Sequence, residues 1–217
     1  MLGRGGEAAA DEERVATARR EAVDLIERVR NILLQPKDEW PKVAAEETTP
    51  QSLYFGYIMI LAAIGPVAML VAFGSLGVGF GLGTAVFTYV QSLIGVAILA
   101  LIVDALAPSF GGTKDLAAAM KLVAYSFTAV WVAQVALLVP MVGMLVVLVG
   151  LIYGFYLFFL GAPVLKKSAP DKAVPYTIAV LISAIVLMYL LGMMARSLGF
   201  GFGMGPGPMA MATGMPR

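Results

Sequence analysis

Asp104 is the residue with the clearest capacity for chemistry, because a long stretch without any charge, residues 48–103, precedes it. A carboxylate in the middle of a membrane is costly and usually functional, whereas one near the end of a span can reach water. We expect Asp104 to lie near such an end, where it caps a helix or pairs with Lys121 or Lys114. Two other roles stay open: the coupling carboxylate of a transporter, and a structural or partner-binding contact.

Lys121 and Ser126 have the residue types of a serine–lysine hydrolase dyad, but their spacing argues against one. Five residues correspond to about 140° around a helix axis, so the two side chains would not face each other. The sequence contains no histidine and no cysteine, which excludes imidazole bases, thiol nucleophiles and His/Cys metal sites. We therefore predict no catalytic residue and no enzymatic activity.

Two further patterns suggest a ligand only weakly. The alternating glycines of residues 77–83 resemble a phosphate-binding loop, but no βαβ unit surrounds them. Four methionines near the C-terminus could offer thioethers to a soft metal such as Cu(I), yet no histidine or cysteine supports them; they are Met204, Met209, Met211 and Met215. We predict no metal and no cofactor.

The composition indicates which elements must position these residues. Of the 217 residues, 60% are hydrophobic and 13% are charged, against roughly 45–50% and about 25% in ordinary globular domains. The mean hydropathy is +0.88. A soluble chain of this size buries about 70% of its unfolded surface, and too little polar material remains here to cover the rest. The sequence therefore predicts a protein embedded in a lipid bilayer.

Two stretches without charged residues, 48–103 and 122–165, hold most of the predicted membrane spans. One span needs about 20 helical residues, so each stretch must fold back once. The glycine-rich residues 74–83 and Pro140 mark the turns, since glycine and proline both interrupt helices. We predict an all-α, polytopic membrane helix bundle (residues 48–198) with five transmembrane helices, near 53–73, 84–106, 117–139, 141–165 and 174–195.

Lysine and arginine assign a direction to these spans, because cytoplasmic loops carry an excess of both residues. With the N-terminus inside, thirteen of the 15 lysines and arginines lie on the cytoplasmic side, and only Arg196 and Arg217 lie outside. We predict a cytoplasmic N-terminus and an extracytoplasmic C-terminus. The net charge of +1 gives no sign of a nucleic-acid partner.

A charged segment, residues 11–47, precedes the first span. Apolar residues recur at three- and four-residue spacing over 11–34 and predict an amphipathic cytoplasmic helix, which follows flexible residues 1–10. This helix would pack on the protein's own cytoplasmic face, lie on anionic headgroups, or dock another protein. Trp40 is expected to be a membrane-interface anchor, since an indole has one apolar and one polar side.

Glycines in the fourth predicted span lie at spacings that let two helix backbones approach closely. They are Gly150, Gly154 and Gly161. They would pack within the bundle or form the seam of a homo-oligomer, and the sequence leaves both open. Residues 199–217, dominated by glycine, methionine and proline, are expected to be a disordered tail.

Several short motifs occur in one order along the chain. They are Ile32-Leu-Leu-Gln-Pro-Lys-Asp-Glu-Trp-Pro-Lys-Val-Ala-Ala-Glu46, Leu106-Ala-Pro-Ser-Phe-Gly-Gly112, Leu122-Val-Ala-Tyr-Ser-Phe-Thr128, Leu151-Ile-Tyr-Gly-Phe-Tyr-Leu-Phe-Phe-Leu-Gly161 and Pro170-Asp-Lys-Ala173. Over about residues 28–195 the chain resembles the Yip1 domain family in its shorter prokaryotic form.

This resemblance implies a cytoplasmic N-terminus, five spans and a place in a prokaryotic plasma membrane. Eukaryotic members of the family are linked to Rab GTPases, vesicle traffic and membrane shaping. They carry an Asp-Leu-Tyr-Gly-Pro motif, whose nearest counterpart here is Asp104-Ala-Leu-Ala-Pro108, without the tyrosine and the glycine.

Taken together, these features predict a non-enzymatic membrane scaffold or adaptor, which engages a protein partner or organises the bilayer through its cytoplasmic face. The candidate functional residues lie in the cytoplasmic turns and the adjoining third span: Asp104, Pro108, Gly111, Gly112, Lys121, Tyr125, Lys166 and Lys167. The alternative is a small transporter or channel, single or oligomeric, in which Asp104 couples the movement of a solute.

Overall fold

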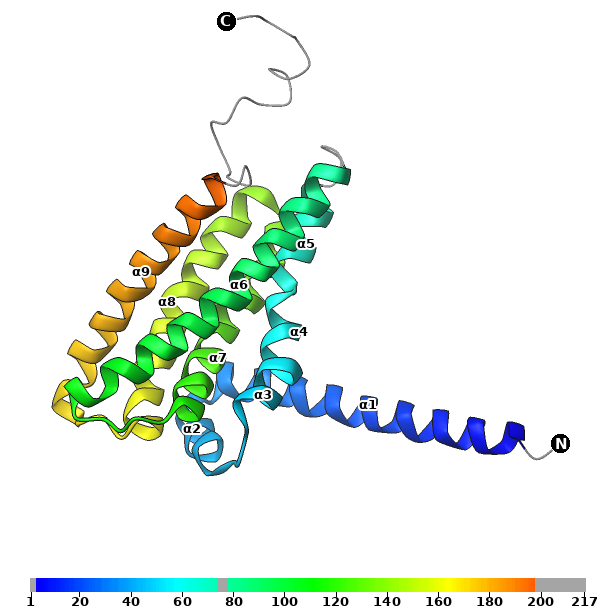
Figure 1. The fold of residues 1–217 in the computed structure, drawn as a ribbon, viewed down its shortest axis with the longest axis horizontal. Coiled ribbons are helices and arrows are strands. Elements are labelled where there is room, and N and C mark those ends of the chain that lie inside the picture. The colour runs from blue at the N-terminus through cyan, green and yellow to red at the C-terminus, as the bar shows by residue number, and fades with distance from the viewer. Residues whose placement is uncertain (1–2, 74–77, 198–217) are drawn as a thin grey trace, which may run out of the picture.

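The structure is a computed structural model that describes residues 3–73 and 78–197. This part of the chain consists of helices and their connections, with no strand (Figure 1). The helices are α1 (Gly3–Leu34), α2 (Pro36–Ala45), α3 (Pro50–Leu53), α4 (Met59–Ala62), α5 (Ile64–Phe73), α6 (Val78–Leu106), α7 (Leu116–Ala133), α8 (Pro140–Leu165) and α9 (Ala173–Ser197).

Five of the segments formed by these helices are long and apolar enough to cross a membrane, which confirms the predicted all-α, polytopic architecture. They are Pro50–Ala72, Leu82–Phe110, Leu116–Leu138, Val142–Leu165 and Ala173–Ser197. Pro140 lies where the third span turns into the fourth, as the first residue of α8. Proline suits this position because the first turn of a helix has no acceptor for its N–H group.

The first two spans differ from the prediction in detail. The first is assembled from α3, a π-helical turn at Tyr54–Ile58, α4 and α5. The helix of the second span, α6, begins at Val78, so it includes the last glycines of the segment 74–83, which we predicted to be a turn. Backbone polar groups in lipid must be paired within the segment, and this requirement favours helix even where glycine is frequent. Residues 74–77 lie outside the described part of the chain.

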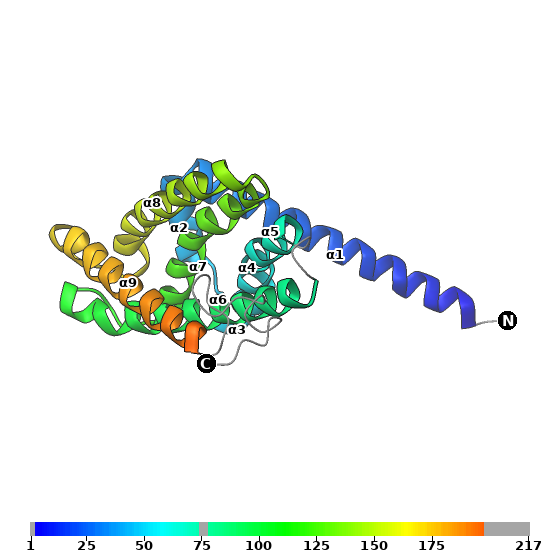
Figure 2. The ribbon, with the colours of Figure 1, turned by 90° about the horizontal axis from the view of Figure 1, so that it is seen from above.

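α7 lies in the interior of the bundle, as the view from above shows (Figure 2). The glycines of α8 bring the two helices into close contact. A Cβ atom added to Gly150 would lie 2.9 Å from the carbonyl oxygen of Ala129, and one added to Gly154 would lie 2.9 Å from that of Ser126. Of the two open roles for these glycines, the structure therefore shows packing within the bundle.

α1 projects sideways from one end of the bundle (Figure 1). Only its C-terminal part packs on the protein: Ile32 is fully buried, whereas Val15 and Val23 are exposed. α1 begins at Gly3, so residues 3–10 are helical where we expected a flexible segment. The alanines of residues 8–10 favour this extension, since alanine has the highest helix propensity. The predicted disordered tail, 199–217, lies outside the described residues.

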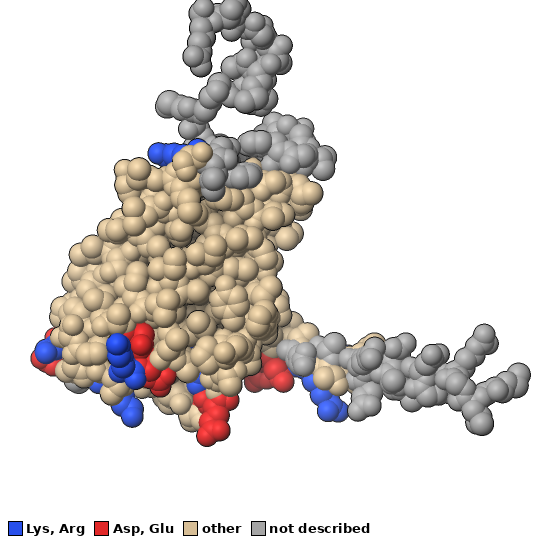
Figure 3. Space-filling view, in the orientation of Figure 1, with Lys and Arg blue, Asp and Glu red and all other residues tan. Residues whose placement is uncertain are grey.

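Charged side chains gather at the end of the bundle from which α1 projects (Figure 3). We call this the charged end; it comprises α1, α2 and the connections at residues 107–115 and 166–172. The opposite end of the spans carries Arg196, in the last turn of α9. The charge separation predicted from sequence is thus present as two distinct ends of one bundle.

Candidate functional site

Asp104, Asp115 and Lys166 form a polar cluster between two connections at the charged end, here called the Asp104 cluster. Lys166 Nζ donates to Asp104 Oδ1 at 2.6 Å and to the Asp115 carbonyl oxygen at 2.8 Å. Asp104 Oδ1 also accepts the backbone N–H of Asp115 at 2.7 Å. Lys166 is fully buried, and a buried ammonium group is tolerated only when it is well paired.

Asp104 therefore pairs with Lys166, and the prediction that it pairs with Lys121 or Lys114 is wrong. The reason is topological. The connection between α8 and α9 returns to the charged end beside the connection between α6 and α7, where Thr113 N donates to the Lys166 carbonyl oxygen at 2.8 Å. Sequence spacing does not reveal this juxtaposition, because 62 positions separate Asp104 from Lys166.

Two glycines fit the same connections together. Gly111 ends a short 3₁₀ helix (Ala107–Phe110) with a φ of 73°, in the left-handed region that glycine adopts without strain. A Cβ atom on Gly112 would lie 2.8 Å from the Lys166 carbonyl oxygen. Pro108, in the 3₁₀ helix, and Lys167, beside the buried lysine, are both exposed. Four of the predicted residues thus surround the Asp104–Lys166 pair.

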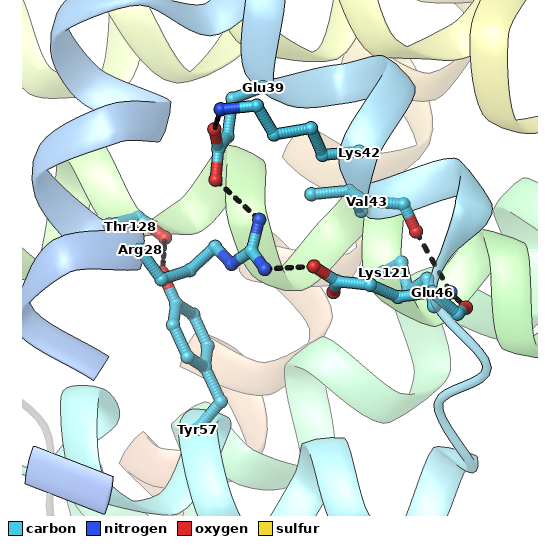
Figure 4. A network of polar contacts seen from close by, with 8 residues as sticks. All are labelled: Arg28, Glu39, Lys42, Val43, Glu46, Tyr57, Lys121 and Thr128. Carbon is cyan, nitrogen blue, oxygen red and sulfur yellow. Dashed lines mark hydrogen bonds and ion pairs between the residues drawn. The ribbon is translucent and has the colours of Figure 1, made fainter. Parts of the chain in front are cut away.

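Arg28, Glu39 and Glu46 form a second polar cluster, the Arg28 cluster, between α1 and the end of α2 (Figure 4). The Arg28 guanidinium contacts both carboxylates, and Lys42 Nζ donates to Glu39 Oε2 at 3.1 Å. Burial lowers the pKa of Arg28, but Glu46 and Glu39 raise it above its ordinary value. The guanidinium therefore stays charged and holds the two helices together.

Sequence reasoning missed the Arg28 cluster, although one signal for it exists. Arg28 lies four residues before Ile32, so both side chains project from neighbouring positions on the face of α1 that packs on the body. A charged residue on a buried helix face requires a partner. Glu39 and Glu46 follow within the next 18 positions.

Lys121 belongs to the Arg28 cluster although it comes from the third span. Its Nζ donates to the Val43 carbonyl oxygen at 3.0 Å and also to the Glu46 carbonyl oxygen (Figure 4). The last carbonyl groups of a helix have no partner within the helix. Lys121 provides a hydrogen-bond donor for these carbonyl groups from a different segment, and a positive charge is favourable at the C-terminal end of a helix. Its role in the structure is to attach α2 to α7.

Tyr125 completes the contact between the spans and the charged segment of residues 11–47, here called the head. The Arg28 Cζ atom lies 5.8 Å from the centroid of the Tyr125 ring, within the range of a cation–π interaction. Trp40 and Tyr57 pack edge-on against the same ring, with centroid distances of 6.3 Å and 4.8 Å. Tyr125 thus contacts α1, α2 and the first span at once.

Trp40 is 1% exposed, so the prediction that it anchors the protein at the membrane interface is wrong. Its ring lies against α8: a Cβ atom on Gly161 would be 2.7 Å from two atoms of the indole. Its Nε1 has no hydrogen-bond partner among the described residues. The cause is that α2 packs against the end of the bundle, which converts an amphipathic residue into a core residue.

The two clusters fix the helix ends of one surface through paired charges. Within residues 3–73 and 78–197, no group of three or more acidic residues is placed to hold a metal ion. The buried charges are engaged with one another, whereas other ionisable side chains of the charged end are exposed: Lys37, Asp38, Lys42, Lys114, Lys167, Asp171 and Lys172. The arrangement can hold the helix ends rigidly and present charges of both signs.

These features define a polytopic helical membrane protein whose charged end is organised by buried ion pairs. Residues 30–204 match the Yip1 domain, which covers most of the chain. The chain therefore belongs to the Yip1 domain family, as its sequence motifs implied. No curated protein and no solved structure matches it.

Proposed function

We propose that this protein is a non-enzymatic membrane scaffold or adaptor, whose charged end faces the cytoplasm and binds a protein partner. One observation carries the proposal: buried Lys166 and Glu39 hold the helix ends in place, while seven other charged side chains of this end are exposed in the same region. A preformed surface with charges of both signs favours specific protein recognition, because electrostatic complementarity sets specificity and association rate.

The contacts of Asp104 argue against the alternative of a transporter. A coupling carboxylate must bind and release a proton or cation in each cycle. Here Asp104 Oδ1 already accepts two hydrogen bonds, one of them from the fully buried Lys166. Displacing Lys166 would leave an unpaired buried charge, which is strongly unfavourable.

The proposed orientation can be tested with single cysteines, since the natural chain has none. Lys172→Cys places a thiol at an exposed position of the charged end, and Arg196→Cys places one at the opposite end. In intact cells, a membrane-impermeant maleimide should label only Arg196→Cys; after lysis it should label both. Labelling of Lys172→Cys in intact cells would overturn the proposed direction.

The proposed partner surface can be tested by affinity purification from native membranes. The double variant Lys167→Glu and Lys172→Glu reverses two exposed charges without touching either cluster, and Arg196→Glu is the matched control at the opposite end. We expect a co-purifying protein with the wild type and the control, and its loss with the double variant. Equal loss from both variants would contradict the surface, and solute flux in proteoliposomes that Asp104→Asn abolishes would favour the transporter.

A further inference from the structure

A cavity of about 390 Å³ lies within the membrane-spanning part, between α6, α7, α8 and α9. α6 and α9 lie side by side at the charged end and diverge toward the opposite end (Figures 1 and 2). The cavity lies between these two helices and α7, and it is partly open to the outside of the bundle. Its volume falls in the range of sites that hold small ligands.

One wall of the cavity contains a polar group that the protein does not satisfy. Ser126 of α7 is 4% exposed and lines the cavity, and its Oγ has no hydrogen-bond partner among the described residues. Buried hydroxyl groups are normally paired with protein, water or a ligand. Three uncharged polar residues of α6 line the same cavity: Thr88, Gln91 and Ser92. These three side chains are half-buried and offer hydrogen bonds to a ligand in the cavity, whereas Ser126 Oγ itself is buried within the wall.

The other residues that line the cavity indicate what kind of ligand it can bind. Apolar side chains provide most of the lining, and they include the aromatic Phe127, Trp131 and Phe158 of α7 and α8. Among the described residues that line the cavity, none is ionisable. A phosphate-bearing headgroup would lose its hydration there without gaining a countercharge. The ligand that fits is apolar along most of its length and carries a neutral hydrogen-bonding group.

Depth in the membrane agrees with this description. Ser126 lies ten residues from the start of α7 at the charged end, and Gln91 lies 15 residues from the end of α6 there. At about 1.5 Å per residue these positions are about 15 and 22 Å along their helices from the charged end, inside the spans Leu116–Leu138 and Leu82–Phe110. A ligand group bonded there lies away from both ends of spans of about 30 Å, so a lipid with an uncharged headgroup suits the site best.

We propose that this cavity binds diacylglycerol, an uncharged glycerolipid of the surrounding bilayer. One acyl chain occupies the apolar part of the cavity, and the glycerol hydroxyl or an ester carbonyl pairs with Thr88, Gln91 or Ser92. The ligand enters from the bilayer between α6 and α9. This site is separate from the charged end, so the lipid-binding proposal can be tested independently of the proposed partner surface.

The test uses the full-length protein in nanodiscs with two photoreactive lipids that carry the same acyl chain, a diacylglycerol and a phosphatidylglycerol. We expect diacylglycerol to label peptides of α6 and α9. Ser92→Ala removes one hydrogen bond and should lower this labelling about fivefold. Ser92→Phe fills the cavity and should abolish it.

Two matched variants control for general changes in the spans. Ser183→Ala removes a hydroxyl that donates to the Ala179 carbonyl oxygen of α9, away from the cavity. Ile94→Phe enlarges an exposed, lipid-facing neighbour of Ser92. Both should keep wild-type labelling, and circular dichroism with size-exclusion chromatography checks that every variant is folded.

Three results would overturn the proposal. Equal labelling by phosphatidylglycerol would mean that the cavity binds any bilayer lipid. Unchanged diacylglycerol labelling in a folded Ser92→Phe variant would place the lipid elsewhere. Cross-links from the cavity to a second copy of the chain, with no lipid adduct, would make this face an oligomer interface.

Discussion

The Asp104 cluster and the Arg28 cluster both place ionised groups at the charged end, but they join different parts of the molecule. The Asp104 cluster links two connections within the five-span domain, and its Lys166 side chain is 0% exposed. The Arg28 cluster links α1 to the end of α2, and its Arg28 side chain is 20% exposed. Because the Asp104 cluster lies between connections of the spans and the Arg28 cluster lies between α1 and α2, we expect the first to stabilise the bundle and the second to attach α1 and α2 to it.

Removing Lys166 should have the largest effect. Lys166→Ala removes a fully buried side chain and leaves the partly exposed Asp104 without its cationic partner. We expect a loss of about 2–4 kcal/mol in the free energy of unfolding, measured by denaturant titration in detergent micelles. Lys167→Ala, at the exposed neighbouring position, is the control and should change little. The double variant Lys166→Met and Asp104→Leu removes both charges and should recover most of the loss. Equal stability of the two alanine variants would contradict the importance of the pair.

A steric change in the same cluster should have a smaller effect. Gly112→Ala brings a Cβ atom to 2.8 Å from the Lys166 carbonyl oxygen, a backbone atom that cannot move aside cheaply. We expect a loss of about 1–3 kcal/mol in the free energy of unfolding. Gly192→Ala is the control, since a Cβ atom there meets nothing within 4 Å. If both variants are equally stable, the fit between the two connections is looser than the structure indicates.

The smallest effect should come from the head. Arg28→Gln removes the charge that holds Glu39 and Glu46, while Glu39 keeps its contact with Lys42. We expect a local loss of about 1 kcal/mol, seen as faster hydrogen exchange in α1 and α2 with unchanged exchange in the spans. Arg30→Gln, at an exposed position of α1, should leave exchange unchanged. Loss of protection in α7 and α8 would show that the two clusters act as one unit.

The spans were predictable from sequence because the bilayer imposes a minimum apolar length, and long runs without charge reveal it directly. Contacts between segments were not predictable from the sequence. The position of Asp104 at a span end could be inferred, but its partner depends on how two distant connections meet. Trp40 has the sequence context of an interface residue, and only the packing of α2 on Gly161 shows that it is buried.

The cavity illustrates a different limit. Thr88 and Gln91 are three residues apart in an apolar span, so the polar face of α6 could have been noticed in the sequence. Attention to ionisable residues alone overlooks such uncharged groups. The lack of a partner for Ser126, however, follows only from the arrangement of four helices around it.

The contact between Lys121 and the end of α2 also sets an order of assembly during synthesis. Lys121 follows its two acceptors in the chain by 78 and 75 positions. At about 5–20 residues per second, a ribosome takes about 4–15 s to cover that distance. The carbonyl groups that end α2 therefore have no bond from Lys121 until the third span has been made. Trp40 can pack against Gly161 only later, when the fourth span has been made. The segment that leaves the ribosome first therefore reaches its final structure late, and its docking marks a chain that is inserted through its fourth span.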